Sequence, residues 1–572
     1  MNEFDQFVKQ KLKIKYYIRY ADDFVILSEN KSHLEGMIPK IAKFLKKNLA
    51  LSLNPDKVFI KTFSSGVDFL GWVNFSHHRV LRTSMKKRAM KKIKENPTPE
   101  TISSYLGLFS HGNIYRLRNE IEKVRDEKKI LNREQKVDYI LYFIYNTNAC
   151  KLKFMSYFEI NGGKKLNGEI EVKGAKNAAL KVVAAALLSR EKWIITNLPQ
   201  IEDVNRILEM VDNLGVNVKK SKNKVEIQAK KIKKTKLSEK LAGKLRASII
   251  LVGPVLARMG KISMPYPGGC VIGKRPIDLF LDGFQKMGAK VKWQNDHFSL
   301  SAKKLKSAKI FFPKITVTGT EAMMITAVLT EGETVLENAA MEPEIPALAE
   351  FLNRCGAKIS GAGTPTIRIK GVKKIGGGRI EIMPDRIETG TFAIMGALCG
   401  GKIKIKKCNP DHIRALLVSF ERTGVKFLEK NNELVVWGAK KIKPVNMVTH
   451  EYPGFATDLQ PPFTLFMTQA LGTSVINEMI WEGRLFFTDT LNSMGAKITV
   501  NNPHQATVYG PTRLRGRRIE SPDLRAGITF LIAGLIAEGK TIIENIYQID
   551  RGYEKIEERL QKLGADIKRV KK

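Results

Sequence analysis

A single cysteine lies in a short glycine-rich and basic stretch, PYPGGCVIGKR, at residues 265–275. The glycines before Cys270 allow the loop to move, and Lys274 and Arg275 place positive charge beside the thiol. Positive charge lowers the pKa of a thiol, and an exposed thiolate is a nucleophile. A lone cysteine is more often a small buried hydrophobe, so the stretch indicates a reactive thiol only if other functional residues accompany it.

Paired aspartates, Asp22 and Asp23, interrupt the apolar strand YYIRYADDFVILS near the start of the chain. Paired carboxylates at a strand turn are how polymerases hold magnesium. Elsewhere the sequence has no GxGxxG and no HExxH motif, and its eight histidines are scattered. No metal site is therefore expected in residues 155–572.

Composition narrows the class of protein. The 572 residues suffice for several domains, and the net charge of +40 suggests an anionic partner such as nucleic acid, acidic lipid or a phosphorylated metabolite. The excess is spread along the chain, which favours a generally lysine-rich surface. The five cysteines never form a CxxC pair, the start lacks a signal-peptide pattern, and the apolar runs are too short to cross a bilayer. We expect a cytoplasmic protein without a membrane partner.

A five-residue motif occurs six times, as LGVNV, MGAKV, CGAKI, TGVKF, MGAKI and LGADI. Its glycines are spaced by 68 to 73 residues, and they are Gly215, Gly288, Gly356, Gly424, Gly495 and Gly564. An amphipathic helical pattern precedes each glycine, so each is expected to end a helix in the left-handed conformation. A short strand follows.

A second helix in most repeats is apolar nearly all round, as in AALKVVAAALL and TFAIMGALCG. Such helices are expected to be buried on all sides, which predicts helices inside and sheets outside. A solenoid is the alternative for a repeated sequence, but it would expose these helices at its ends.

With these repeats, residues 155–572 resemble the enolpyruvyl transferases, and within them the enzymes that act on UDP-N-acetylglucosamine. The motifs that carry the resemblance are KGAKNAAL, LRASIILVGP, PGGCVIGKRPID, PDRIETGTF, FATDLQPPF, WEGR, DLRAG and IDRGYEKIE. The resemblance implies an α/β fold, a two-domain inside-out barrel of six βαβαββ repeats. Domain I would comprise residues 155–175 and 386–572, and domain II residues 176–385.

The activity implied by the resemblance is transfer of the enolpyruvyl group of phosphoenolpyruvate to the 3-hydroxyl of UDP-N-acetylglucosamine. Phosphate leaves through a tetrahedral intermediate, and no cofactor is needed. This reaction is the first committed step of peptidoglycan precursor synthesis. A shikimate-pathway transferase is the alternative within the family, although there the lysine motif reads differently and the cysteine loop is absent.

The same resemblance assigns the site residues. The implied catalytic residues are Cys270, Asp458 (the base), Asp523 and Arg551, and Cys270 is implied to bond covalently to phosphoenolpyruvate and to be alkylated by fosfomycin. Cations suited to the phosphate and carboxylate of phosphoenolpyruvate are Lys176, Arg275, Arg484, Arg525 and Arg551. The residues implied to bind UDP-N-acetylglucosamine are Asn177, Arg246, Asp278, Lys314, Thr316, Val317 and Asp458. PDRIETGTF adds Asp385, Arg386 and Glu388.

Two positions depart from the family pattern, and so does the run LFFTDTL after Arg484. Phe280 stands where the family often has histidine, and Ala456 where it often has proline. Plain strand is the alternative structure for residues 313–320, which contain Lys314, Thr316 and Val317.

Residues 14–120 resemble the palm and thumb of prokaryotic reverse transcriptases. YADD supplies Asp22 and Asp23, and Lys57 is implied as a proton donor to pyrophosphate. The family also needs a metal-binding aspartate and nucleotide-binding fingers upstream of YADD, so we expect this remnant to be inactive as a polymerase and to bind nucleic acid weakly or not at all. A truncated mobile element joined to a neighbouring gene would explain the arrangement.

Residues 121–154 show no clear periodicity and are expected to be a linker. The main alternative to an enzyme is a nucleic-acid-binding protein that uses residues 1–120 and the positive charge, with the repeats as scaffold. The number of copies in an assembly is not indicated by the sequence.

Overall fold

The computed structural model divides into two compact units between Lys153 and Phe154. It describes residues 2–14, 16–20, 23–28, 31–49, 51, 53–61, 67–69, 72–74, 79–81 and 139–145 of the N-terminal unit. In the C-terminal unit it describes residues 156–243, 245–268, 277–294 and 297–571. Among all these residues, none forms a helix long and apolar enough to cross a membrane.

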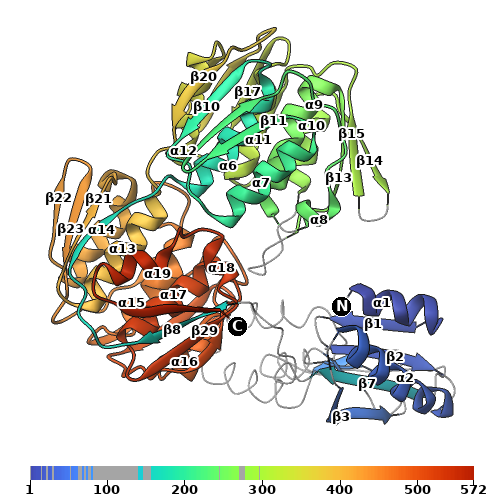
Figure 1. The fold of residues 1–572 in the computed structure, drawn as a ribbon, viewed down its shortest axis with the longest axis vertical. Helices are drawn as coiled ribbons and strands as arrows, with labels where there is room; N and C mark the ends of the chain where they lie inside the picture. Colours follow the sequence, from blue (N-terminus) through green and yellow to red (C-terminus); the bar gives the residue numbers. More distant parts are fainter. Residues whose placement is uncertain are drawn as a thin grey trace, which may run out of the picture. The chain divides into compact units, whose positions relative to one another are not determined.

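The N-terminal unit packs helices against an antiparallel sheet with strand order β1-β2-β7-β3 (Figure 1). Its described elements are α1 (Asn2–Gln6), the π-helical turn Phe7–Lys11, β1 (Tyr16–Tyr20), β2 (Asp23–Ser28), α2 (Lys31–Leu49), β3 (Leu53–Lys61), β4 (Val67–Phe69), β5 (Trp72–Asn74), β6 (Arg79–Leu81) and β7 (Tyr139–Tyr145). Phe4, Phe24 and Leu45 are fully buried in its core. Asp23 begins β2 and Lys57 lies in β3, whereas Asp22 and residues 82–120 of the expected palm and thumb lie outside the described residues.

Residues 139–145 differ from the expected linker. They form β7, which pairs with β2 on one side and β3 on the other. The run YILYFIY consists of aromatic and aliphatic residues, β-branched isoleucines among them, which favour strands. Because this run has no helical periodicity, the sequence pattern does not indicate an element here.

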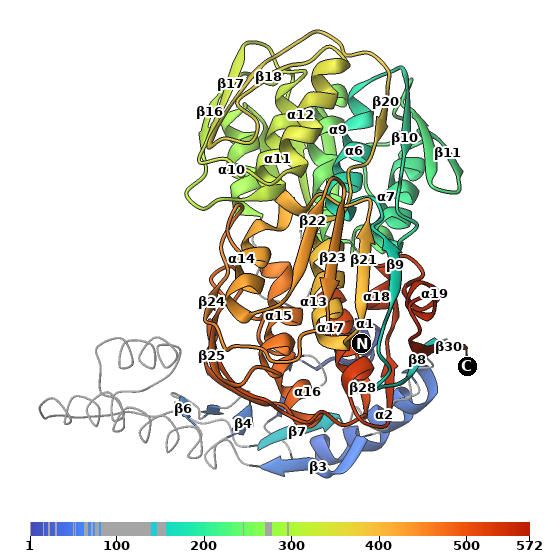
Figure 2. The ribbon, with the colours of Figure 1, turned by 90° about the vertical axis from the view of Figure 1, so that its left-hand side faces the viewer.

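The C-terminal unit has two lobes (Figures 1 and 2). The central lobe is residues 175–385. Its helices, 3-10 turns included, are α6 (Lys176–Ala185), η4 (Ala186–Leu188), α7 (Glu202–Asn213), α8 (Glu239–Ala242), η5 (Arg246–Leu251), α9 (Val252–Met259), α10 (Asp278–Lys286), α11 (Val317–Ala327) and α12 (Glu344–Arg354). Its strands are β10 (Lys192–Thr196), β11 (Asn217–Ser221), β12 (Lys224–Gln228), β13 (Lys261–Pro265), β14 (Lys290–Gln294), β15 (His297–Ser301), β16 (Lys309–Phe311), β17 (Glu333–Glu337), β18 (Lys358–Ser360), β19 (Thr366–Lys370) and β20 (Gly378–Glu381).

The flanking lobe is built from residues 156–174 and 386–571, which flank the central lobe in sequence. Its helices, 3-10 turns included, are α13 (Arg386–Cys399), η6 (Pro410–Ile413), α14 (Arg414–Thr423), η7 (Thr457–Leu459), α15 (Gln460–Met467), α16 (Thr488–Ser493), α17 (Leu524–Ile536), α18 (Tyr547–Asp550) and α19 (Ile556–Gln561). Its strands are β8 (Ser156–Asn161), β9 (Gly168–Glu171), β21 (Lys402–Lys406), β22 (Phe427–Lys430), β23 (Glu433–Trp437), β24 (Met447–Val448), β25 (Gly472–Asn477), β26 (Lys497–Asn502), β27 (Gln505–Gly510), β28 (Arg518–Glu520), β29 (Lys540–Glu544) and β30 (Asp566–Lys571).

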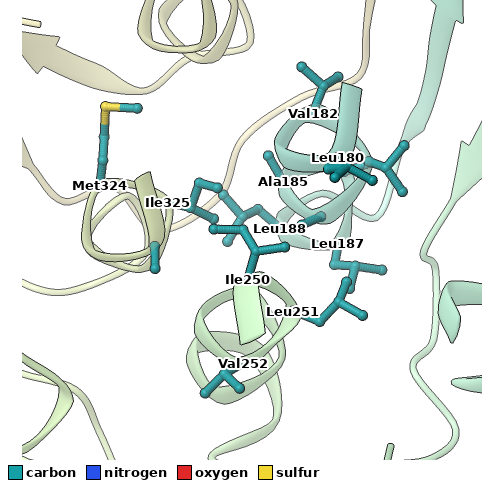
Figure 3. Packing of buried hydrophobic residues seen from close by; sticks show 14 of the residues in the cluster. Leu180, Val182, Ala185, Leu187, Leu188, Ile250, Leu251, Val252, Met324 and Ile325 are labelled. Carbon is teal, nitrogen blue, oxygen red and sulfur yellow. The ribbon is translucent and has the colours of Figure 1, made fainter. Parts of the chain in front are cut away.

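Helices lie inside each lobe and sheets outside, as the all-round apolar helices predict (Figures 1 and 2). The described strands of each lobe form three sheets: β11-β12-β10-β20, β13-β15-β14 and β16-β17-β19-β18 in the central lobe, and β22-β23-β21-β9, β24-β25-β27-β26 and β28-β29-β8-β30 in the flanking lobe. Figure 3 shows Leu188, Ile250 and Ile325 meeting between three helical segments of the central lobe, and each is almost completely buried. Two hydrophobic cores result, one in each lobe.

The six repeated glycines end their helices as predicted. All have positive φ angles, from 81° at Gly215 to 111° at Gly495. They follow α7, α10, α12, α14, α16 and α19. A side chain at these φ angles would be strained, which explains why the repeat keeps glycine there.

Two chain segments cross between the lobes side by side. Gly174 and Pro384 form an antiparallel bridge, and the flanking backbone hydrogen bonds join Ala175 N to Met383 O and Asp385 N to Lys173 O. A Cβ at Gly174 would lie 1.9 Å from Asn197 O, so no larger residue fits this crossing. The crossing brings the start of α6 and the start of α13 to the boundary between the lobes.

Candidate active site

A cavity of about 460 Å³ lies between the two lobes. The first residues of α6 and α11 line it from the central lobe, and those of α13 and α17 from the flanking lobe. The amino ends of helices carry partial positive charge and unpaired N–H groups. The helix backbones alone therefore make the cavity favourable for binding an anion.

Asp458 lies in this cavity between two arginines. Its Oδ1 accepts a hydrogen bond from Arg484 Nη2 at 2.5 Å, and its Oδ2 accepts one from Arg525 Nη2 at 2.8 Å. Burial alone would raise the pKa of Asp458, but Arg525, Arg484 and Lys176 outweigh burial and hold that pKa far below its usual range. The carboxylate is ionised and, in this arrangement, a weak base.

Hydrogen-bond acceptors hold the two arginines in place. Arg484 Nε lies 3.4 Å from Thr457 Oγ1, which in turn donates to Glu478 Oε2 at 2.9 Å. Arg525 Nη1 donates to the hydroxyl of Tyr553 at 3.1 Å. Burial raises the pKa of Tyr553 to about 12, so this hydroxyl is neutral. The guanidinium groups thus have fixed orientations toward the cavity.

Lys176 and Arg551 meet at a second carboxylate, Asp203. Lys176 Nζ lies 3.4 Å from Asp203 Oδ2, and Arg551 Nε donates to Asp203 Oδ1 at 2.8 Å. Lys176 and Asp203 belong to the central lobe and Arg551 to the flanking lobe. Four of the five cations expected to bind phosphoenolpyruvate therefore line one cavity, and together they come from both lobes.

Asp523 and Thr316 line the cavity and also cap helices. Asp523 Oδ1 accepts hydrogen bonds from the backbone N–H groups of Arg525 and Ala526 at the start of α17. Thr316 Oγ1 accepts from Gly319 N at the start of α11. Residues 317–327 are thus a helix, and the alternative of plain strand for this stretch is wrong.

The remaining described residues expected to bind the sugar nucleotide also line the cavity. Arg246 begins η5 and donates to Pro267 O at 2.8 Å, while Asp278 begins α10. Phe280, one of the departures from the family pattern, is buried in the same wall. The cavity also includes Asn177, Lys314 and Val317.

Two expected site residues are not described by the structure, and two others lie elsewhere than in the cavity lining. Cys270 and Arg275 lie outside the described residues. Asp385 caps α13 and accepts a hydrogen bond from Lys176 N, and Glu388 pairs with Arg559 and with Lys173 N. The last two carboxylates fix the lobe crossing and do not line the cavity.

Sequence reasoning missed five acidic residues that line the cavity: Glu451 and Glu482, and, near the starts of α7 and α12, Asp203, Glu342 and Glu344. The buried Arg386 Nε donates to Glu344 Oε1 at 3.1 Å, so a second ion pair joins the lobes. In the sequence the last three residues resemble the acids that commonly begin helices. Only their place between the lobes distinguishes them. Among the described residues, no group of three His, Cys, Asp or Glu side chains is arranged to hold a metal ion.

Two family models match the chain. A model described as EPSP synthase (3-phosphoshikimate 1-carboxyvinyltransferase) matches residues 160–560. A model described as reverse transcriptase (RNA-dependent DNA polymerase) matches residues 1–73.

Curated relatives cover the C-terminal unit. A UDP-N-acetylglucosamine 1-carboxyvinyltransferase from Koribacter versatilis is 43% identical over 420 residues, which is 73% of this chain and 97% of the relative. An enzyme of the same name from Trichlorobacter lovleyi is 45% identical over 412 residues, or 72% of this chain and 98% of the relative.

Solved structures share the fold. The enolpyruvyl transferase NikO from Streptomyces tendae superposes with a TM-score of 0.67 at 24% identity, over 73% of this chain and 99% of that one. EPSP synthase from Acinetobacter baumannii superposes with a TM-score of 0.60 at 18% identity, over 73% of this chain and all of that one. The inside-out α/β architecture expected from the repeats is confirmed.

Proposed function

The chain belongs to the EPSP synthase family, and we propose that residues 155–572 are a UDP-N-acetylglucosamine 1-carboxyvinyltransferase. The reaction moves the enolpyruvyl group of phosphoenolpyruvate to the 3-hydroxyl of the sugar and releases phosphate, in the first committed step of peptidoglycan precursor synthesis. One observation carries the proposal: Lys176, Arg484, Arg525 and Arg551, from both lobes, line a single cavity with Asp458.

Shikimate 3-phosphate is the competing acceptor within the family. The relatives named for UDP-N-acetylglucosamine are 42 to 45% identical to this chain and are covered almost completely. The solved EPSP synthase is only 18% identical, so its likeness extends to the fold alone. These figures favour the sugar nucleotide as acceptor.

We assign the anions to different parts of the cavity. Arginine binds carboxylate and phosphate with two donors at once, so the cations around Asp458 and Asp203 suit phosphoenolpyruvate. The N-terminus of α11, with Lys314 and Val317 beside it, suits the diphosphate of the sugar nucleotide. Domain closure would gather these groups and exclude water.

Asp458 is proposed as the base that takes the proton of the 3-hydroxyl. Arg484 and Arg525 both bind it and suppress its basicity. Phosphoenolpyruvate, an anion, competes for the same guanidinium groups. As they turn toward the anion, the pKa of Asp458 rises, so the base becomes effective only when the second substrate is present.

Addition of the hydroxyl oxygen to the C2 carbon of phosphoenolpyruvate needs a proton at C3. The tetrahedral intermediate then expels phosphate while C3 gives up a proton, which forms the double bond of the enolpyruvyl product. Asp523 borders the same cavity, where a second carboxylate could share the proton transfer. Cys270 follows two glycines and precedes two cations in the sequence, which supports a reactive thiol that bonds to phosphoenolpyruvate and is alkylated by fosfomycin.

We place the reaction in the cytoplasm. Cys355, Cys399 and Cys408 are buried and form no disulfide, which is typical of reducing compartments. The N-terminal unit, residues 1–153, is not assigned a part in the transfer. The prediction that it is inactive as a polymerase stays a prediction.

A phosphate-release assay with phosphoenolpyruvate and UDP-N-acetylglucosamine tests the function on the full chain and on residues 155–572, which retain every described element of the C-terminal unit. Both proteins should release phosphate at similar rates. Turnover of shikimate 3-phosphate instead would favour the other acceptor. A salt-dependent RNA affinity that disappears with residues 1–154, without phosphate release by either protein, would favour the nucleic-acid-binding alternative.

A further inference from the structure

Asp203 joins the two lobes at the edge of the candidate site. It lies in the first turn of α7, where the helix dipole favours a negative charge, and its side chain is only 4% exposed. One carboxylate oxygen contacts Lys176 and the other Arg551. A single buried carboxylate thus fixes one cation from each lobe.

A second contact, close to Asp203 in the structure, also joins the two lobes. The backbone N–H of Gln200, just before α7, donates to Glu554 Oε2 at 2.7 Å. Arg551 also donates from Nη1 to Gln548 Oε1 at 3.0 Å, so its guanidinium plane is held at two edges. These contacts fix the orientation of the Arg551 guanidinium group.

We propose that Asp203 is a positioning residue for phosphoenolpyruvate. Its carboxylate sets the distance between Lys176 and Arg551 across the cleft, so that both cations bind the same anion. The proposal rests on the proposed function of the site. An ammonium has three donors and a guanidinium five, so both cations can keep Asp203 while they bind the anion. Asp203 itself touches no reacting atom.

Asp203 also acts on the charge of Lys176. Burial lowers the pKa of Lys176, and Arg525 and Arg551 lower it further, whereas Asp203 and Asp458 raise it. Asp203 contributes the largest opposing effect. Without it, Lys176 would lose its proton at a lower pH, and a neutral amine would bind the anion less well.

The test is steady-state kinetics of the full chain, with phosphoenolpyruvate varied at saturating UDP-N-acetylglucosamine. For Asp203→Asn we expect KM for phosphoenolpyruvate to rise about tenfold to a hundredfold, with a much smaller change in KM for the sugar nucleotide. The alkaline limb of kcat/KM for phosphoenolpyruvate should move to lower pH. Asp203→Glu, which keeps the charge, should restore most of the affinity and the pH profile.

Asp212→Asn is the matched control, because Asp212 lies on the same helix and is exposed. It should behave as wild type. The proposal is wrong if Asp203→Asn keeps the wild-type KM for phosphoenolpyruvate and the wild-type pH profile. It is also wrong if the Asn and Glu variants lose activity equally with an unchanged pH profile, because the role would then be structural.

The proposed function can fail separately. If wild-type protein releases no phosphate with UDP-N-acetylglucosamine, the assignment of the acceptor is wrong. Calorimetric titration with phosphoenolpyruvate alone then tests the positioning role of Asp203. Weaker binding by Asp203→Asn than by wild type would support the positioning role. Equal binding, or no binding by either protein, would overturn it.

Discussion

Asp458 and Arg525 are 67 residues apart in the chain and form a partly buried ion pair, in which Arg525 Nη2 donates to Asp458 Oδ2 at 2.8 Å. Arg484 reaches the other oxygen of the same carboxylate. An ionised carboxylate between two guanidinium groups is stabilised by both and is a weak base. The arrangement predicts that catalysis depends on exchange of arginine partners.

Asp458→Ala should therefore nearly abolish turnover. The substitution removes the proposed base and leaves Arg484 and Arg525 buried without their carboxylate. Loss of a general base lowers rates about a hundredfold to ten-thousandfold. The phosphate-release assay measures the rate, and urea unfolding measures whether the unpaired arginines also destabilise the flanking lobe.

Asp458→Asn separates the two effects, because the amide keeps the shape and can still accept a hydrogen bond. It should fold more stably than the alanine variant and remain almost inactive. Wild-type turnover in either variant would remove Asp458 from the mechanism.

Glu344→Gln should destabilise the C-terminal unit. Arg386 Nε lies 3.1 Å and 3.3 Å from the two carboxylate oxygens of Glu344, and both side chains are buried at the lobe boundary. Loss of one partner leaves a buried charge uncompensated, at a cost of about 3 to 5 kcal/mol when the partner is removed outright. The amide retains a hydrogen bond, so we expect the lower part of this range in urea unfolding.

Glu350→Gln is the control for this prediction, since Glu350 lies on the same helix, α12, and is exposed. It should change the free energy of unfolding by no more than about 0.5 kcal/mol. Equal stability of the Glu344 and Glu350 variants would show that the pair between the lobes contributes nothing.

The repeat explains how much of the fold can be predicted from the sequence. Glycines such as Gly215 and Gly495 repeat because each helix needs a left-handed stop, a requirement that is local and visible in the sequence. Apolar helices such as residues 386–399 predict their own burial in the same way. The strand at residues 139–145 could not be predicted from periodicity, since its pairing partners, β2 and β3, are more than 75 residues away.

The site is only partly predictable, for a physical reason. Arg525 and Lys176 belong to motifs that can be matched one by one, but Asp203 functions through its distance from Arg551, 348 residues away. Asp523, by contrast, has a local structural role: its position before α17 makes it an N-cap. Contacts between distant segments are set by the closed fold and leave no local signal.

Cys270→Ser should cripple turnover. The serine hydroxyl is nearly isosteric but remains protonated at neutral pH, whereas a cysteine can react as its thiolate. Phosphate release should fall strongly, and the variant should resist inactivation by fosfomycin, as measured by mass spectrometry of the adduct. Cys355→Ser, at a buried thiol whose pKa is raised by burial, is the control and should keep activity and sensitivity. An adduct on Cys270→Ser would contradict the assignment.

The buried pair of Lys181 and Glu321 predicts a pH-dependent stability. The two groups approach to 2.9 Å, and burial raises the pKa of Glu321 to about 7 although Lys181 lowers it. The folded protein therefore keeps a proton that the unfolded chain releases near pH 4.5. The stability that this group contributes is fully present below that pH and is lost as the pH rises to about 7.

Glu321→Gln cannot release a proton, so it should lose less stability than wild type between about pH 5 and about pH 8, by up to about 3 kcal/mol. Its absolute stability should be lower, because Lys181 loses its partner. Urea unfolding at a series of pH values measures the difference, with the exposed Glu350→Gln as a variant that should follow the wild-type slope. If Glu321→Gln also follows that slope, the carboxyl is ionised throughout and Lys181, rather than burial, decides its charge.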